Sequence, residues 1–570
     1  MTHPASGTAK KSDLTPTQQQ WVDTTFASLT LREKIGQTVN ERWISRSVAD
    51  SNPETIGAYF EKYPLGSLFC GGEIIKGAGN SAEATLEGLT LCQKISKVPL
   101  LVAGDLESGA GAAVRGLTAF PQQMALGAAN DEKLAYDYGK FTAIEGRAAG
   151  FNWTYAPVVD LLQNWLNPVV SNRALGADPD HVGRMALDVI RGMQDHAMAA
   201  CAKHFPGDGV DFRDQHLVTS INSLSKEAWE NNHGRVFQKV IDGGVYSIMS
   251  GHIALPWFEP FGPESKRPRP GTVSRRILHE LLREQMKFEG VVVSDALEMA
   301  GFTGWAGYDQ RMIEAFNAGN DIMLWPQERY FAVMERALNE GLVKMERLDE
   351  SVRRILTLKA RLGLGDMDKN GHDPHAESLQ GSSLSPELTS QARFVATQVA
   401  ARSVTLIRNR ENLLPFDAKK VKRILLHLAS PTPLKESNLT LLVEGLKARG
   451  MELKILENGN CLDVWNLEKA GERWDAYVVI FNLQIHQIKN TVRPAGAMAE
   501  VMWTLQNAET VRPVVVSLGT PFLLHDLPFL DTLINCHSAS DSTIQALVQA
   551  LLDETPFAQF SPVDCGGAWF

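Results

Sequence analysis

The segment at residues 202–216, AKHFPGDGVDFRDQH, combines two histidines, three aspartates, a lysine and an arginine with two glycines. Side chains of these types can ligate a metal ion, surround a phosphate or transfer protons. Glycine adds backbone angles that other residues avoid, which lets a loop turn or move. The segment therefore predicts a functional loop, and three kinds of chemistry are open for it.

Two of these three readings find little support in the spacing. The histidines and aspartates could supply nitrogen and oxygen ligands to a divalent ion. However, their spacing matches no H-E-x-x-H or similar zinc motif, and Lys203 would bring a positive charge to the site. The G-D-G of the segment lacks the G-K-[ST] ending of a phosphate-binding loop. We expect no metal and no cofactor.

Proton transfer fits the end of the segment. Asp214 and His216 are two residues apart, so their side chains point the same way in an extended stretch. A carboxylate beside an imidazole fixes its tautomer and favours the protonated ring. The pair predicts a proton donor, although an isolated D-x-H is more often a solvated loop pair.

A second candidate is Asp295, which follows the run VVVS. A carboxylate after apolar residues is costly to bury unless cations or hydrogen-bond donors lie nearby. Lys203, His204 and Arg173 are the candidates for that role. A carboxylate kept ionised in this way can act as a nucleophile.

The elements that must position these residues alternate between short apolar runs and segments with the helical period. Strands that alternate with helices predict a parallel sheet, and its closure predicts a (β/α)8 barrel with chemistry at the carboxyl ends of the strands. An open doubly wound sheet is the alternative, but no G-x-G-x-x-G follows the first strand. The predicted strands are 35–39, 66–71, 99–104, 152–158, 198–204, 245–250, 290–295 and 321–325. The polar residues that follow or end them are Asp105, Glu107, Asp160, Lys203, His204, His252, Ser294 and Asp295.

The length of 570 residues exceeds what one compact core holds and predicts more than one domain. Residues 363–385 are rich in Gly, Asp and Ser without periodicity, which indicates a linker. We therefore predict a barrel domain at 1–362, a linker at 363–385 and a three-layer α/β/α sandwich domain at 386–570. The second domain has predicted strands at 403–409, 423–429, 452–456, 476–482, 513–519 and 532–536, and helices near 387–401, 434–449, 497–507 and 542–553.

The composition limits the classes of partner. A net charge of -10 argues against a general nucleic-acid binder, and the six scattered cysteines form no CxxC pair. No apolar run approaches the ~20 residues that cross a bilayer, and the polar N-terminus has no apolar stretch of a secretory signal. We expect a cytoplasmic protein without a membrane partner.

Several motifs together resemble glycoside hydrolase family 3, and in particular its β-N-acetylglucosaminidase branch. They are AKHFPGDG followed by DQH, GTVSRRILHELLREQMKFEGVVVSDALEMAG, NPVVSNRALGADP, FPQQMALGAA and ARSVTLIRNRENLLPF. The likeness covers roughly residues 25 to 555. Asp208 is a departure, because the branch often carries histidine at that position.

The resemblance implies roles for individual residues. Asp295 matches the nucleophile of a retaining mechanism, which forms a covalent glycosyl-enzyme. His216, paired with Asp214, matches the acid/base on a mobile loop, where most retaining glycosidases use a second carboxylate. The residues that resemble the sugar-binding set are Asp105, Arg173, Lys203 and His204. The family also implies the barrel and the sandwich.

The leading hypothesis is an exo-acting β-N-acetylglucosaminidase that removes terminal GlcNAc from small glycans such as cell-wall muropeptides or chitin oligosaccharides. Phosphorolysis is an open variant, because a neutral imidazole repels phosphate less than a carboxylate does. A β-glucosidase of the same family is a second alternative. A catalytically silent glycan-binding protein is a third, although such a protein needs neither a nucleophile nor a proton donor.

Overall fold

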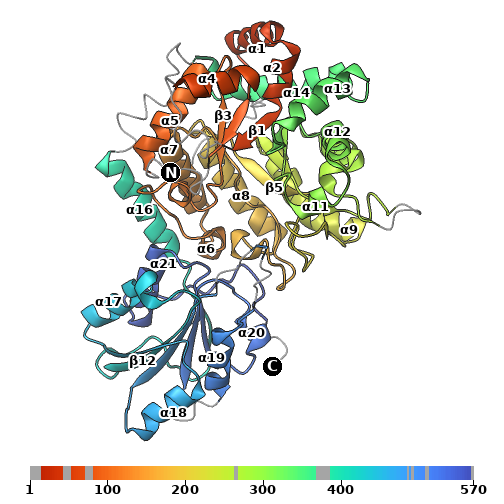
Figure 1. The fold of residues 1–570 in the computed structure, drawn as a ribbon. Coiled ribbons are helices and arrows are strands. Elements are labelled where there is room, and N and C mark those ends of the chain that lie inside the picture. Colours follow the sequence, from red (N-terminus) through yellow and green to blue (C-terminus); the bar gives the residue numbers. More distant parts are fainter. Residues whose placement is uncertain are drawn as a thin grey trace, which may run out of the picture.

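The computed structural model describes residues 14–42, 53–70, 81–261, 267–366, 385–483, 487–488, 493–506 and 512–566. Most of the predicted linker lies outside these residues, since 367–384 are not among them. Figure 1 shows two units, one above the other. We refer to described residues up to 366 as the N-terminal unit and to those from 385 as the C-terminal unit.

Parallel strands build the N-terminal unit. A five-stranded sheet has the order β10-β1-β2-β3-β4, and a three-stranded sheet has the order β5-β7-β9. A short parallel pair, β6 (Ser220–Ile221) and β8 (Ile253–Ala254), lies apart from them. The strands of the two larger sheets are β1 (Val39–Arg42), β2 (Ser67–Phe69), β3 (Leu101–Gly104), β4 (Trp153–Thr154), β5 (Cys201–Phe205), β7 (Ser247–Ser250), β9 (Val291–Ser294) and β10 (Met323–Leu324).

Isolated parallel bridges connect these two sheets. Trp153 pairs with Ala199, which joins the β4 edge to the segment that leads into β5. Val293 of β9 pairs with Ile322, next to β10. All of these pairings are parallel, and the predicted α/β fold is confirmed.

The predicted strand at 35–39 is wrong for most of its length. Residues 31–37 form the helix α2 (Leu31–Gln37), and β1 begins only at Val39. Thr30 caps the helix and shares a reciprocal capping box with Glu33, which satisfies two backbone donors. Ile35 is buried as a helical residue. A short apolar run reads equally well as a strand or as a helix, and here the cap decides.

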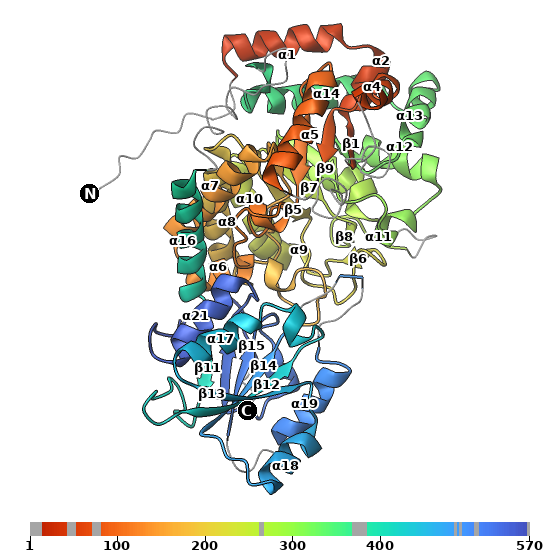
Figure 2. The ribbon, with the colours of Figure 1, turned by 60° about the vertical axis from the view of Figure 1, so that its left-hand side comes forward.

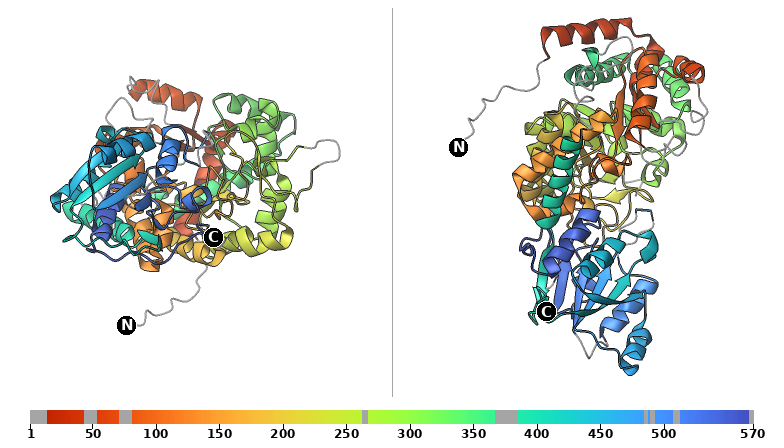
Figure 3. Two further views of the ribbon diagram at one scale, coloured as in Figure 1. Left: turned by 90° about the horizontal axis from the view of Figure 1, so that it is seen from below. Right: turned by 90° about the vertical axis from the view of Figure 1, so that its left-hand side faces the viewer.

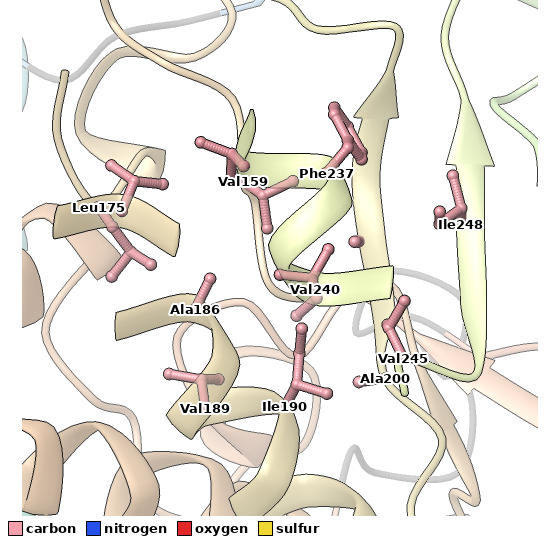
Figure 4. Close-up of a cluster of buried hydrophobic side chains, with 14 of the residues drawn as sticks. Val159, Leu175, Ala186, Val189, Ile190, Ala200, Phe237, Val240, Val245 and Ile248 are labelled. Carbon is pink, nitrogen blue, oxygen red and sulfur yellow. The ribbon is translucent and has the colours of Figure 1, made fainter. Parts of the chain in front are cut away.

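Helices surround the strands of the N-terminal unit. They are α1 (Pro16–Ser28), α4 (Pro53–Lys62), α5 (Ala82–Ile95), α6 (Gln123–Ala129), α7 (Glu132–Ala148), α8 (Pro179–Gln194), α9 (Lys226–Trp229), α10 (Arg235–Asp242), α11 (Ala300–Thr303), α12 (Tyr308–Ala318), α13 (Arg329–Asn339) and α14 (Met345–Arg361), with a π-type helix at Arg276–Gln285. Figure 4 shows how α8 and α10 close the core: Val189 and Ile190 of α8 and Val240 of α10 lie near Ala200, which directly precedes β5, and Ile248 of β7.

The C-terminal unit has a six-stranded sheet in the order β11-β16-β15-β14-β12-β13. It is parallel except that β11 runs antiparallel to β16. Its strands are β11 (Thr405–Asn409), β12 (Arg423–Ala429), β13 (Glu452–Glu457), β14 (Ala476–Phe481), β15 (Pro513–Ser517) and β16 (Thr532–Asn535). Its helices are α16 (Pro386–Ala401), α17 (Thr440–Ala448), α18 (Cys461–Lys469), α19 (Ala497–Gln506), α20 (Leu523–Asp526) and α21 (Asp541–Leu551).

Alternate residues of these strands face two separate apolar clusters. Val478 and Val516 pack against α17 and α21 on one face, whereas Val479 and Val515 pack against α19 and α20 on the other. This alternation follows from the period of two in a strand. Helices therefore cover both faces of the sheet.

Helix α16 crosses from the C-terminal unit to the N-terminal unit. It runs beside α6 and α7 (Figure 2), and the same arrangement is visible from the side in Figure 3. Its buried residues Ala392, Val395, Ala396 and Val399 belong to the apolar cluster of the N-terminal unit, while Ala400 belongs to a cluster of the C-terminal unit. The two units thus share apolar packing through one helix.

Candidate active site

A cavity of about 760 Å³ lies at the carboxyl ends of the parallel strands. Ile488 and Gln487 of the C-terminal unit also line it. Lining residues that belong to the strands or follow them directly are Arg42, Phe69, Asp105, Tyr155, Lys203, His204, Met249, Asp295, Leu324 and Trp325. The cavity therefore lies where the strand order predicts chemistry.

The structure brings all seven predicted site residues together. Six of them line the cavity, namely Asp295, His216, Asp105, Arg173, Lys203 and His204. Asp214 is the seventh, and its carboxylate contacts Nδ1 of His216. These residues come from different strand ends and from the 202–216 segment, so the fold assembles one site from distant parts of the chain.

Asp295 stands at the end of β9. Its backbone N–H donates to the carbonyl of Ser250 over 2.9 Å, and its Oδ1 accepts a hydrogen bond of 2.7 Å from the backbone N–H of Ala296. Burial alone would raise its pKa. The imidazoles of His204, His252 and His216, together with the Ala296 N–H, hold the pKa of Asp295 below the ordinary aspartate value. The structure therefore favours an ionised Asp295.

Lys203 and Arg173 pair with other carboxylates. Glu107 accepts two hydrogen bonds from the Arg173 guanidinium, at 2.9 and 2.7 Å, and lies 2.6 Å from Lys203 Nζ. Asp105 Oδ1 lies 3.0 Å from the same Nζ. Burial alone would raise the pKa of Glu107, but the guanidinium and the ammonium hold it well below its usual range. Two of the three side chains predicted to support Asp295, Lys203 and Arg173, are thus paired with other carboxylates, whereas the third, His204, is among the imidazoles that lower the pKa of Asp295.

The pair Asp214–His216 is joined at short range. His216 Nδ1 lies 2.7 Å from Asp214 Oδ1, which also accepts the backbone N–H of His216 over 2.8 Å. The Asp214 side chain is fully buried, whereas 21% of the His216 side chain remains exposed at the cavity. An imidazole with Nδ1 bound to a carboxylate keeps its Nε2 for a proton transfer.

His204 is held in a similar way. Its Nδ1 lies 2.7 Å from Asp160 Oδ2, and Asp160 Oδ1 accepts the backbone N–H groups of His204 and Asp208. Asp160 is completely buried. Burial alone would raise its pKa, but His204 and these donors hold the pKa of Asp160 below the usual value. The orientation of the His204 ring toward the cavity is therefore fixed.

The loop that carries His216 is anchored along its length. Asp208 Oδ2 accepts from the Gln215 side chain over 3.2 Å, and Gln215 Oε1 accepts the backbone N–H of His252 over 2.9 Å. The backbone N–H of Ala300 donates to the carbonyl of His216 over 2.9 Å. In this structure the loop places His216 at the cavity.

His252 lies beside Asp295 and forms hydrogen bonds through both ring nitrogens. Its Nδ1 lies 2.8 Å from the Thr272 hydroxyl, and its Nε2 lies 3.0 Å from the carbonyl of Ala296. Burial lowers the pKa of His252. Both ring nitrogens are engaged, so this histidine is a structural part of the Asp295 surroundings.

Arg42 lies on another wall of the cavity. Its guanidinium is 3.8 Å from the ring centroid of Trp325 and forms an ion pair of 2.7 Å with Glu298. Both charged side chains are partly exposed, and all three residues line the cavity. This wall of the cavity therefore combines an aromatic side chain with a pair of opposite charges.

In the described part of the chain, His, Cys, Asp and Glu form no group of three or more that could hold a metal ion. The acidic residues of the 202–216 segment have other partners. Asp211, for example, accepts from the Arg213 guanidinium and from the backbone N–H of Ile221.

Three of the residues that hold the site together had no assigned role in the sequence prediction. Glu107 and Asp160 were recognised only as polar residues after strands, yet they hold the cations and the imidazole in place. Their position after a buried strand was the available signal. Ile488 was missed altogether, because it acts through its backbone N–H, which every residue type except proline carries.

Comparison with known proteins assigns the chain to a family. The model of the glycosyl hydrolase family 3 N terminal domain matches residues 30–358. A β-N-acetylglucosaminidase/β-glucosidase of Cellulomonas fimi is 33% identical over 574 residues, which span 96% of both chains. The chain belongs to glycosyl hydrolase family 3 and is a glycosidase, which confirms the predicted family, its branch and the enzyme class.

Solved structures agree with this assignment. A β-glucoside phosphorylase, BglX, bound to 2FGlc superimposes with a TM-score of 0.84 at 28% identity, over 97% of this chain and 98% of that chain. A family 3 β-N-acetylglucosaminidase from Paenibacillus sp. str. FPU-7 gives a TM-score of 0.78 at 25% identity, over 94% of this chain and 99% of that chain.

Among the helices of the described residues, none has both the length and the apolar character to traverse a bilayer.

Proposed function

We propose that the protein is a retaining exo-β-N-acetylglucosaminidase that hydrolyses terminal GlcNAc from amino-sugar glycans. The observation that carries this proposal is that one cavity is lined by a carboxylate and by an imidazole that is bound to a second carboxylate. Asp295 and His216 both line it, and Asp214 lies 2.7 Å from His216 Nδ1. The names of the relatives from Cellulomonas fimi and Paenibacillus support the substrate class.

The mechanism has two steps. A carboxylate oxygen of Asp295 attacks the anomeric carbon while His216 Nε2–H gives its proton to the departing glycosidic oxygen. This leaves a glycosyl ester on Asp295. His216 then takes a proton from water, which attacks the anomeric carbon and releases the sugar with retained configuration. Asp214 orients the ring and stabilises its protonated form in both steps.

Asp105, Arg173, Lys203 and His204 hold the terminal sugar. Lys203 and Arg173 are donors, Asp105 is an acceptor, and all of them line the cavity. Glu107 and Asp160 fix three of these side chains, so that little side-chain entropy is lost when a sugar binds.

The fold proposal accompanies this mechanism. The parallel bridges at both edges of the two sheets support a closed (β/α)8 barrel over residues 1–362. Apolar clusters on both faces of the second sheet support an α/β/α sandwich over 386–570, with a linker at 363–385.

A covalent adduct is the decisive test. Incubation with a 5-fluoro β-GlcNAc glycoside that has a good leaving group slows the release of the glycosyl enzyme, and peptide mass spectrometry then locates the label. We expect the label on Asp295. Labelling of another residue, or turnover with inverted configuration, would refute the proposed mechanism.

A second candidate is phosphorolysis, in which phosphate takes the place of water. Two points favour it: the proposed acid/base is an imidazole, which repels phosphate less than a carboxylate does, and the β-glucoside phosphorylase BglX is similar over nearly the whole chain. Assays with and without phosphate separate the two reactions, because only phosphorolysis yields a sugar 1-phosphate.

The preferred sugar is tested separately. The Cellulomonas fimi relative is named for both β-N-acetylglucosaminidase and β-glucosidase activity. We expect a higher kcat/KM for nitrophenyl β-GlcNAc than for nitrophenyl β-glucoside. The reverse order would assign the chain to the β-glucosidases of the family.

A further inference from the structure

The C-terminal unit reaches the predicted acid/base pair through one backbone group. Ile488, in the stretch that follows β14, donates its backbone N–H to Asp214 Oδ2 over 2.5 Å. The two residues are 274 positions apart in the chain. Ile488 also lines the cavity, together with His216. The contact therefore links the C-terminal unit to the carboxylate that orients the imidazole.

The Asp214 carboxylate is buried and is stabilised by the hydrogen bond from Ile488. The Asp214 side chain is fully buried, and a buried carboxylate is costly unless its oxygens accept hydrogen bonds. Oδ1 accepts both donors of His216, whereas Oδ2 accepts the N–H of Ile488. Burial alone would raise the pKa of Asp214, and the donors from His216 and Ile488 hold it below the usual value. Loss of the Ile488 N–H would remove the hydrogen bond that Asp214 Oδ2 accepts from the C-terminal unit.

The backbone of Ile488 adopts a conformation that its residue type disfavours. The residue has a φ of +70°, in the left-handed region that β-branched residues disfavour. Its side chain does not explain this conformation, because the residue is 62% exposed. Residues held in sparsely populated backbone regions cluster at active sites and ligand clamps. Here the strained residue delivers its N–H to Asp214.

A purely mechanical link between the units is the alternative explanation. Other contacts across the interface have that character: the N–H of Ala177 donates to the carbonyl of Pro562, and the N–H of Gln122 donates to the Ser538 hydroxyl. Neither of these reaches Asp214 or His216. The Ile488 contact differs because its acceptor is the carboxylate of the pair itself.

We propose that the backbone N–H of Ile488 is a positioning group for the Asp214–His216 pair, so that the C-terminal unit forms part of the catalytic site. It keeps Asp214 ionised and oriented, and through Asp214 it aligns His216 with the leaving oxygen. The proposal rests on the proposed function of His216 as the acid/base.

The test replaces Ile488 by its α-hydroxy analogue in the full-length chain, which changes the amide N–H to an ester oxygen and keeps the side chain. Protonation of the leaving group limits kcat/KM for an unactivated substrate such as chitobiose, but not for a 2,4-dinitrophenyl β-glycoside. We expect kcat/KM for chitobiose to fall about 10- to 100-fold, since a hydrogen bond to a charged group is lost. The value for the dinitrophenyl substrate should change less than twofold.

The matched control is an ester at Gly471, in the same unit. Gly471 also has a positive φ, of +83°, and its N–H donates to the carbonyl of Glu468 over 3.0 Å, in an exposed turn. This ester removes one backbone hydrogen bond remote from the cavity. We expect wild-type values for both substrates.

A second readout does not depend on activity. The 13C resonance of the Asp214 carboxyl, assigned by its loss in Asp214→Asn, reports the pH at which this group is protonated. The ester at 488 should raise that pH, and the ester at 471 should not. Unchanged titration, or an equal loss for both substrates, would overturn the proposal. If the wild-type protein cleaves neither substrate, the proposed function fails, and the carboxyl titration alone decides the role of Ile488.

Discussion

Asp208 is a carboxyl group whose surroundings oppose its charge. Burial and the nearby charge of Asp160 raise its pKa to about 7 in the folded chain. In the unfolded chain an aspartate has a pKa of about 3.9. The folded state therefore binds an additional proton between about pH 4 and pH 7, and this contribution to stability is lost as the pH rises through that window.

The variant Asp208→Asn removes this titration. We expect its free energy of unfolding, relative to that of the wild type, to increase between pH 5 and pH 8 by on the order of 2 kcal/mol. Denaturant titrations at the two pH values measure this difference. A difference that stays constant between pH 5 and pH 8 would contradict the raised pKa.

Glu107 has a different role, because it holds two cations that face the cavity. Glu107→Gln keeps the shape of the side chain but removes the negative charge between Lys203 and Arg173. We expect kcat/KM to fall about 10- to 100-fold, since hydrogen bonds to charged groups are lost, with most of the effect in KM. Steady-state kinetics test this, and an unchanged KM would show that Glu107 does not position the sugar-binding cations.

At the scale of elements, the sequence predicts most of the site because strand ends are easy to recognise. Asp105, Lys203, His204 and Asp295 follow apolar runs, and the structure places all of them at one cavity. The predicted strand at 35–39 failed, since a five-residue apolar run carries no period long enough to separate strand from helix. The capping box at Thr30 and Glu33 was the overlooked signal.

The loop that carries His216 depends on Gly209. Its φ is +98°, and a Cβ there would lie 2.0 Å from the carbonyl oxygen of Leu161. Gly209→Ala must shift the loop, so we expect kcat/KM for chitobiose to fall about 100-fold, as misplacement by ~1 Å suffices for such a loss. A dinitrophenyl substrate should be affected much less.

The control for Gly209→Ala is Gly244→Ala. Gly244 has a φ of +83°, and no atom lies within 4 Å of the position of its Cβ. The control therefore carries a comparable backbone strain without a collision. Equal losses of activity in the two variants would show that the collision with Leu161 is not the cause.

For the whole molecule, the contact that no sequence pattern could reveal is the one between units. The sequence predicts two domains, and Glu107 or Asp160 could be noticed as polar residues after strands. A backbone N–H has no side-chain pattern, so the approach of Ile488 to Asp214 becomes visible only when the units are placed together. The same holds for α16, whose apolar positions indicate a buried helix but not which unit covers it.

The packing of α16 predicts that the two units unfold together. Val399 is fully buried in the apolar cluster of the N-terminal unit, although it belongs to the first helix of the C-terminal unit. Val399→Ala should cost about 1–3 kcal/mol through lost burial and an internal cavity. Because the helix is shared, calorimetry should show one transition that moves to lower temperature.

Val548→Ala, in α21 and in a cluster of the C-terminal unit, is the matched control. It removes the same two methyl groups from a side chain that belongs to the C-terminal unit alone, and it should move the same single transition. Two separate transitions, of which Val548→Ala moves only one, would show that α16 does not couple the units.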